Sequence, residues 1–267
     1  MSPVAYGTFS NQAVMFASIL YALALLSHMA EWSIRRPRPA AVEAAPVPVG
    51  AGPNRSPAAA EVAEPSPDRV ALAGRLGVNL TAVGFIVHLA AVVARGLAAD
   101  RVPWGNMYEF TLVASLGVAG MYLAMLRRYR LGWLGLPVTG FLVVVLMLAV
   151  LTLYAPPGPL VPALQSYWLV IHVTAAMIAT GAFTLGALLS ALFLVKQRAE
   201  KRGTAARGYL ARLPSTDDMD EVAFRVHAFG FPVWTFAALL PVRSGPSTRG
   251  AASGVGTPRR CGPSSLG

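Results

Sequence analysis

The sequence predicts an all-α fold, a polytopic membrane bundle of helices with about five complete spans and an incomplete sixth. Of the 267 residues, 55% are hydrophobic and only 13% are charged. The mean hydropathy of +0.55 lies far above that of ordinary soluble domains. Apolar segments of about 20 residues, long enough to cross a hydrocarbon core, recur along the chain. Clusters of arginine and lysine follow alternate segments, which is typical of cytoplasmic loops.

Composition also excludes several classes of function. The single cysteine, Cys261, rules out an internal disulfide framework and a metal or cluster site made of cysteines alone. The net charge of +10 would suit a nucleic-acid partner, but the basic residues gather at the ends of apolar segments. Membrane orientation therefore accounts for most of the charge, and we predict no nucleic-acid partner.

Residues 1–36 are predicted to form an N-terminal transmembrane anchor. Its apolar run, 11–30, is followed by Arg35 and Arg36, which places the N-terminus outside and the other end of the helix in the cytoplasm. Residues 37–70 are rich in alanine and proline and poor in large apolar side chains. We expect them to form a disordered cytoplasmic linker.

The membrane domain is predicted to cover residues 71–241. An incomplete sixth span begins at residue 222, after complete spans at 76–94, 107–126, 131–153 and 167–195. Arg127 and Lys196 open the basic clusters that follow two of these spans. These clusters fall on the predicted cytoplasmic side, so the protein is expected to be a multi-pass membrane protein with its N-terminus outside.

The four histidines, His28, His88, His172 and His227, are candidates for carrying chemistry. An imidazole in hydrocarbon is costly unless it is hydrogen-bonded or ligated, so each histidine has a packed and a functional interpretation. His172 differs in position, because it lies near the outer surface, shortly after Trp168 at the start of the fifth span.

The other outer loop carries a second aromatic and polar set, VPWGNMYEF at 102–110. Glu109 stands at the start of a span and needs a partner, for which Arg101 and Arg95 are close enough in sequence. By topology this loop and His172 share one face of the membrane.

Three segments resemble consecutive signatures of a known family. They are WGNMYEF at 104–110, LQSYWLVIHV at 164–173 and AFRVHAFGFPVWTF at 223–236. In order and spacing they are similar to the CcsA/ResC family of system II cytochrome c biogenesis proteins. The long linker after the first span resembles the actinobacterial form usually called CcsB. This resemblance implies a multi-pass protein of the bacterial plasma membrane.

The resemblance implies a protein that binds b-type haem as a transported substrate. It would present haem on the extracytoplasmic face for covalent attachment to the CxxCH motif of apocytochrome c. It would work with a ResB-type membrane partner, as a component of a holocytochrome c synthase, or haem lyase.

The resemblance also implies roles for individual residues. His172 would be an axial ligand of the haem iron. His88 would be a second-rank candidate for haem transit through the bilayer. The residues that shape the outer haem chamber would be Trp104, Asn106, Tyr108, Glu109 and Trp168.

Residues 242–267 depart from the family pattern. The family carries a tryptophan-rich haem segment directly after the third signature, whereas this chain continues as VRSGPSTRGAASGVGTPRRCGPSSLG. A shift of the reading frame turns the tryptophan codon TGG into a glycine codon, and a shifted family-like segment reproduces this tail. We therefore expect a frameshift between about Phe236 and Val242, a disordered tail, and weak or absent haem retention and assembly activity.

Two rival functions remain open from the residues alone. A small-solute transporter would use His88 and Glu109 as intramembrane polar groups. A structural membrane scaffold would merely pack its histidines against neighbouring helices. A haem spectrum that depends on His172 would separate both rivals from the haem interpretation.

Overall fold

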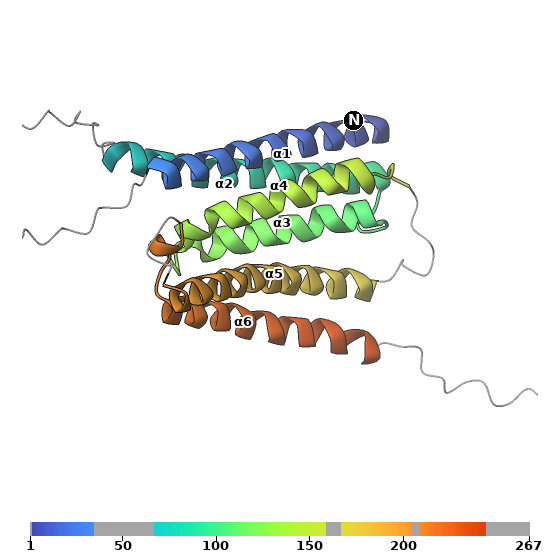
Figure 1. Ribbon diagram of the computed structural model, residues 1–267. Helices are drawn as coiled ribbons and strands as arrows, with labels where there is room; N and C mark the ends of the chain where they lie inside the picture. The colour runs from blue at the N-terminus through green and yellow to red at the C-terminus, as the bar shows by residue number, and fades with distance from the viewer. Residues whose placement is uncertain (1, 35–66, 159–166, 204–208, 244–267) are drawn as a thin grey trace, which may run out of the picture.

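The fold is a bundle of long α-helices (Figure 1). The computed structural model describes residues 2–34, 67–158, 167–203 and 209–243, and no strand occurs within these ranges. In chain order the elements are α1 (Pro3–Ile34), α2 (Pro67–Ala99), α3 (Met107–Leu126), η1 (Leu131–Leu134), α4 (Gly135–Thr152), α5 (Tyr167–Lys201), η3 (Leu210–Arg212) and α6 (Thr216–Arg243).

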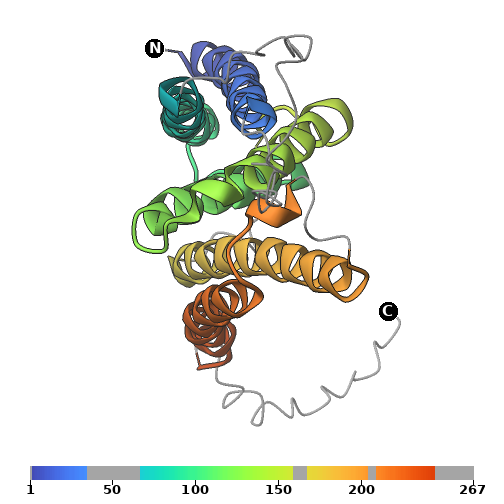
Figure 2. The ribbon, with the colours of Figure 1, turned by 60° about the vertical axis from the view of Figure 1, so that its left-hand side comes forward.

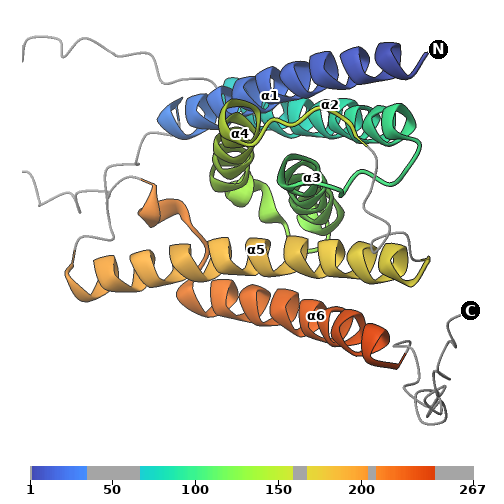
Figure 3. The same cartoon turned by 90° about the vertical axis from the view of Figure 1, so that its right-hand side faces the viewer.

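Five of these helices, α1 to α5, are long and apolar enough to cross a membrane. The protein is therefore a multi-pass membrane protein, and the predicted all-α class is confirmed. The sixth helix, α6, has 28 residues and begins with Asp217 and Asp218 in its first turn. It runs beside α5 (Figures 1 and 3), as expected for a further span with a polar start.

Two predicted boundaries differ from the observed helices. Helix α2 begins at Pro67, inside the predicted linker 37–70, because proline at the first helical position loses no intrahelical hydrogen bond. Helix α6 continues through Arg243 and so extends past the predicted end of the membrane domain at residue 241. The remainder of the predicted linker and of the predicted tail 242–267 lies outside the described residues.

The helices are arranged as three pairs, with α3 and α4 between the α1–α2 pair and the α5–α6 pair (Figures 1 and 2). Figure 3 shows the middle pair crossing the outer pairs at an angle. Helix α1 packs mainly on α2, and α6 packs on α5. The core between the layers contains buried side chains from every pair, including Tyr21, Leu112, Leu142 and Leu185.

Glycines bring the layers into close contact. A Cβ atom at Gly181 of α5 would lie 2.7 Å from the backbone oxygen of Gly117 in α3, so only glycine permits this crossing. On the other side of α5, Gly186 leaves room for the imidazole of His227 in α6, and Gly230 of α6 faces Ala182. Helix α5 is thus fixed between two neighbours by small residues, the usual device of membrane helix packing.

One end of the bundle, here named the basic end, carries the exposed side chains of Arg127, Arg128, Arg130 and Lys201. At this end the hydroxyl of Tyr209 donates to the backbone oxygen of Trp133 in η1 at 3.1 Å. This hydrogen bond joins the segment before α6 to the segment before α4. Burial raises the pKa of the Tyr209 phenol. The opposite end, here named the Glu109 end, contains the loop between α2 and α3 and the start of α5.

Candidate functional site

His172 lies in the second turn of α5 at the Glu109 end. Its Nδ1 atom is 2.6 Å from the backbone oxygen of Ala237 in α6. A carbonyl oxygen only accepts, so Nδ1 carries the proton and donates. In the neutral ring the lone pair is then on Nε2, the nitrogen that faces away from this bond.

This hydrogen bond gives His172 the features of an oriented metal ligand. Histidines that bind metal ions commonly donate their second ring nitrogen to a carbonyl or carboxylate, which fixes both tautomer and ring orientation. The His172 side chain is half-buried. Trp168 lies one helical turn earlier on the same face of α5 and exposes 49% of its surface, so an indole and an imidazole are presented together.

The loop between α2 and α3 is held by Glu109, whose side chain is fully buried. Its carboxylate pairs with Arg95 (Nε to Oε1, 3.2 Å) and with Arg101 (Nη1 to Oε2, 2.7 Å). It also accepts from the backbone nitrogen of Gly105 at 2.9 Å. The sequence predicted Arg101 or Arg95 as the partner of Glu109, and the structure uses both.

Asn106 and Tyr108 belong to the same assembly. Asn106 is the N-cap of α3, because its Oδ1 accepts from the backbone nitrogen of Glu109 at 2.8 Å. The ring of Tyr108 is buried and lies under the guanidinium of Arg95, with 5.0 Å from Cζ to the ring centroid. These two predicted site residues therefore stabilise the loop and the first turn of α3.

Arg95 connects this loop to the rest of the Glu109 end. It is completely buried, and it donates to Oδ1 of Asn11 in α1 at 3.4 Å and to the backbone oxygen of Ala155 after α4. Arg101 donates from Nε to the backbone oxygen of Gly158 at 2.9 Å. One carboxylate and two guanidinium groups thus join α1, α2, α3 and the segment after α4.

Trp104 is placed apart from His172. It lines an apolar cavity of about 390 Å³ between α2, α3 and α5, together with Phe85, Met121 and Met177. The imidazole of His172 instead contacts α6. The predicted haem-chamber residues therefore form two groups, His172 with Trp168 on α5, and Trp104 with the Glu109 network on the adjoining loop.

His88 is buried in the middle of the bundle. Its ring lies edge-on to Tyr21, 6.0 Å between centroids, and beside the backbone of Leu112. Within the described residues neither ring nitrogen makes a hydrogen bond of normal geometry. His28 is buried as well and lies 3.6 Å (Nδ1 to Oε2) from Glu31.

Sequence reasoning missed the contributions of Asn11 and Glu31. Asn11 joins the Arg95 network from α1, a contact that depends on how α1 packs against α2. Glu31 is a buried carboxylate at the basic end. The sequence feature that could have indicated it is the spacing of His28 and Glu31, three residues apart at the end of an apolar segment.

Comparison with known proteins identifies the family. The family model described as "Cytochrome C assembly protein" matches residues 104–240, slightly more than half of the chain. The chain belongs to this family. The matched range contains Glu109, His172 and most of α6, and the three sequence signatures fall inside it. The predicted membership of the cytochrome c assembly family is thereby confirmed, and it connects the chain with cytochrome c biogenesis.

Individual relatives match parts of the chain. The chain is 35% identical over 133 residues to the cytochrome c biogenesis protein CcsA of Synechococcus sp. (strain JA-3-3Ab), covering 49% of this chain and 37% of the relative. It is 34% identical over 164 residues to CcsA of Picosynechococcus sp. (strain ATCC 27264 / PCC 7002 / PR-6), covering 58% and 47%. It is 29% identical over 173 residues to the protein HemX of Brevibacillus brevis, covering 63% and 61%. The chain thus spans less than two thirds of each of these relatives.

Proposed function

We propose that this cytochrome c assembly protein binds haem at the Glu109 end and presents it for covalent attachment to apocytochrome c. The observation that carries the proposal is the hydrogen bond from His172 Nδ1 to the Ala237 backbone oxygen, 2.6 Å long. It orients the ring so that Nε2 faces away as an iron ligand. Family membership supports the choice of haem as the ligand.

The part that the protein plays in this reaction is positioning. His172 holds the iron through Nε2, and the exposed indole of Trp168 packs against the porphyrin face. The thiols of the CxxCH motif add across the vinyl groups of haem, a step that needs no oxidant, because each S–H is consumed as a C–S and a C–H bond form. The protein fixes the geometry, while the haem supplies the reactivity.

The Glu109 network acts as a support for this site. Glu109, Tyr108 and Asn106 are positioning residues, because they are buried or cap α3 and stabilise the loop that carries Trp104, which lines the apolar cavity. His88 remains a second-rank candidate for haem transit. The rival transporter function loses one of its two polar groups, since both carboxylate oxygens of Glu109 are already paired with arginine.

Orientation and partners belong to the proposal as well. The basic end faces the cytoplasm by the inside rule, which puts the N-terminus and His172 on the extracytoplasmic face. A ResB-type membrane protein is the expected partner. The tail 242–267 is proposed to be an out-of-frame version of the tryptophan-rich haem segment. Resequencing of the locus tests this, because an intact frame with no such motif in the adjacent frame would contradict it.

The experiment is a haem titration of the purified chain in detergent, followed by absorbance in the Soret region. It is performed with the chain as written and with a frame-restored version, each as wild type, His172→Ala and His227→Ala. His227 is the matched control, because its Nδ1 also donates to a backbone oxygen, that of Ala223 at 2.7 Å, but at the opposite end of α6.

We expect His172→Ala to weaken haem binding by about tenfold or more, the effect typical of losing an axial or second-shell interaction at a metal. His227→Ala should leave haem binding unchanged. The frame-restored protein should bind haem more tightly than the chain as written. Equal haem affinity of wild type and His172→Ala in the frame-restored protein would refute the proposed ligand.

A further inference from the structure

Trp234 is an exposed tryptophan on α6, close to the candidate haem ligand. Half of its surface, 50%, is exposed. It lies three residues before Ala237, whose backbone oxygen accepts the hydrogen bond from His172 Nδ1. Its ring lies beside that of Phe231, with 6.5 Å between the centroids and 30° between the ring planes. The indole therefore belongs to an aromatic pair on the exposed side of α6.

Helices α5 and α6 run antiparallel and in contact along their length (Figures 1 and 3). His172 near the start of α5 contacts Ala237 near the end of α6, and Gly186 later in α5 contacts His227 in the first half of α6. This register places Ala237 at the level of His172. Trp234 is three residues away from Ala237, roughly 4.5 Å along the helix axis, so it lies within one turn of that level.

Trp234 and His172 also lie on the same side of the α5–α6 pair. The rings of Phe183 in α5 and His227 in α6 lie against each other, with 6.1 Å between the centroids, which marks one side of the interface. His172 precedes Phe183 by 11 residues, and Trp234 follows His227 by seven residues. These separations are close to three turns and two turns of an α-helix. A helix repeats its direction after whole turns, so all four side chains point to one side.

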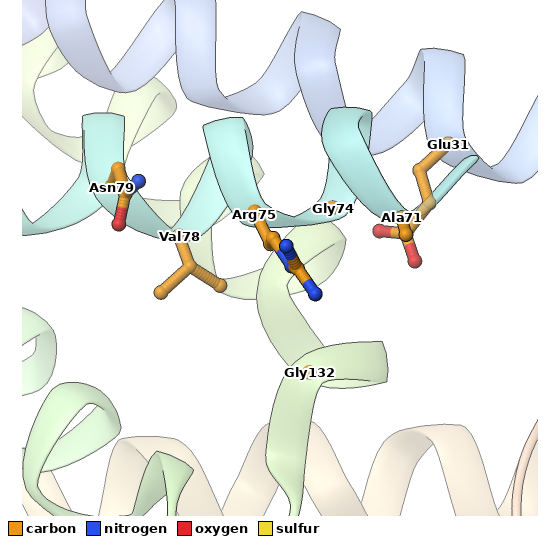
Figure 4. A pocket seen from close by; sticks show the side chains of 7 residues that line it. All are labelled: Glu31, Ala71, Gly74, Arg75, Val78, Asn79 and Gly132. Carbon is orange, nitrogen blue, oxygen red and sulfur yellow. The ribbon is translucent and has the colours of Figure 1, made fainter. Parts of the chain in front are cut away.

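A haem bound through His172 needs apolar contacts for its large planar ring. Trp168, one turn before His172 and 49% exposed, supplies one such contact from α5. Two cavities of the bundle lie elsewhere. The apolar cavity at Trp104 is on the α3 side of α5, and a cavity of about 420 Å³ (Figure 4) lies between α1, α2 and η1 at the basic end. The aromatic side chain that α6 offers at the level of His172 is Trp234.

We propose that Trp234 contacts the haem bound at His172 and, together with Trp168, encloses the macrocycle from the second helix. The inference rests on the proposed function, because it takes haem as the ligand of His172. The indole is a flat apolar surface of the kind that packs against other aromatic rings in offset or edge-on arrangements. The haem then lies across the contact between α5 and α6, and its binding depends on both helices.

A tryptophan near a membrane boundary also serves as an anchor in the interfacial aromatic belt. The matched control for that role is Phe236, which exposes 53% of its surface on the same helix. It lies two residues beyond Trp234, about 200° further around the helix, and therefore faces the other side of the pair. A belt anchor acts on membrane insertion and stability, whereas a haem contact acts on haem affinity.

The test is a haem titration of the purified full chain in detergent, as written and frame-restored, followed by absorbance in the Soret region. The variants are Trp234→Leu, Trp234→Phe, Phe236→Leu and His172→Ala. We expect Trp234→Leu to weaken haem binding by about two- to tenfold. Trp234→Phe should retain most of the affinity, because phenylalanine keeps an aromatic ring at this position. Phe236→Leu should leave haem affinity unchanged, and thermal unfolding without haem should be similar for the two leucine variants.

The outcomes in the frame-restored protein separate this inference from the proposed function. Unchanged affinity in Trp234→Leu, with binding lost in His172→Ala, would overturn the role of Trp234 and leave His172 as the ligand. Equal weakening by Trp234→Leu and Phe236→Leu would also contradict the inference, because the effect would not depend on the side of α6. Haem binding that does not depend on His172 would refute both proposals.

Discussion

Removal of the Glu109 carboxylate is expected to destabilise the whole Glu109 end. In Glu109→Gln the side chain keeps its volume, but two guanidinium groups lose their counter-charge. The side chain of Arg95 is completely buried and that of Arg101 is only 11% exposed. Breaking a buried ion pair by removing one partner typically costs about 3–5 kcal/mol, because the remaining charge is left uncompensated.

The matched control is Glu221→Gln on α6. Glu221 pairs with Arg225, but their side chains are 59% and 52% exposed, and exposed pairs on a helix contribute only about 0.3–0.5 kcal/mol. Both variants replace a carboxylate by a carboxamide of similar size, and so each removes one negative charge. The difference between them therefore measures burial rather than net charge.

The assay is thermal or denaturant unfolding of the purified protein in detergent, with the wild type measured in parallel. Glu109→Gln should lower the free energy of unfolding by several kcal/mol, and Glu221→Gln should change it by less than about 1 kcal/mol. The double variant Arg95→Met/Glu109→Leu should recover part of the loss, since it removes the more deeply buried of the two guanidinium charges that the loss of Glu109 leaves uncompensated. Equal, small effects of Glu109→Gln and Glu221→Gln would refute the argument that this network holds the end together.

Two further predictions concern packing and pH. Gly181→Val should strongly destabilise the protein, because its Cβ would lie 2.7 Å from the Gly117 backbone oxygen. Unfolding in detergent should show a far larger loss of unfolding free energy than for the control Gly132→Ala, because a Cβ at Gly132 meets nothing within 4 Å. Burial raises the pKa of Tyr209 in the folded protein, so its contribution to stability is fully present below the unfolded pKa of about 10 and is lost as the pH rises above it. Tyr209→Phe should therefore reduce the loss of stability between about pH 9 and 12, and an unchanged alkaline unfolding profile would contradict this.

Hydropathy alone predicted the class of the fold and the approximate positions of the spans. This succeeded because the bilayer imposes a length and a composition on every spanning helix. The helix ends were less well predicted. Helix α2 starts at Pro67, in a segment whose composition resembles a linker, because a proline at the first helical position is compatible with a helix start.

The candidate site was predictable only where its contacts are local in sequence. Arg101 and Glu109 are close along the chain, and their pairing could be expected. The participation of Asn11 depends on the packing of α1 against α2, and the acceptor for His172 lies in another helix, at Ala237. Sequence patterns also suggested one chamber for His172 and Trp104, whereas the structure places them on different sides of α5. Their roles toward haem remain predictions.

The acceptor of the His172 hydrogen bond is a backbone atom, so no side-chain substitution at position 237 removes it. The orientation of the imidazole therefore depends on the position of α6 relative to α5. Gly230 of α6 packs against Ala182 of α5, and Ala237 lies two turns beyond that contact, roughly 10 Å along the helix axis. A slight pivot of α6 about Gly230 would move the carbonyl and turn the ring with it. Any movement of α6 on α5 would therefore change the direction in which Nε2 points.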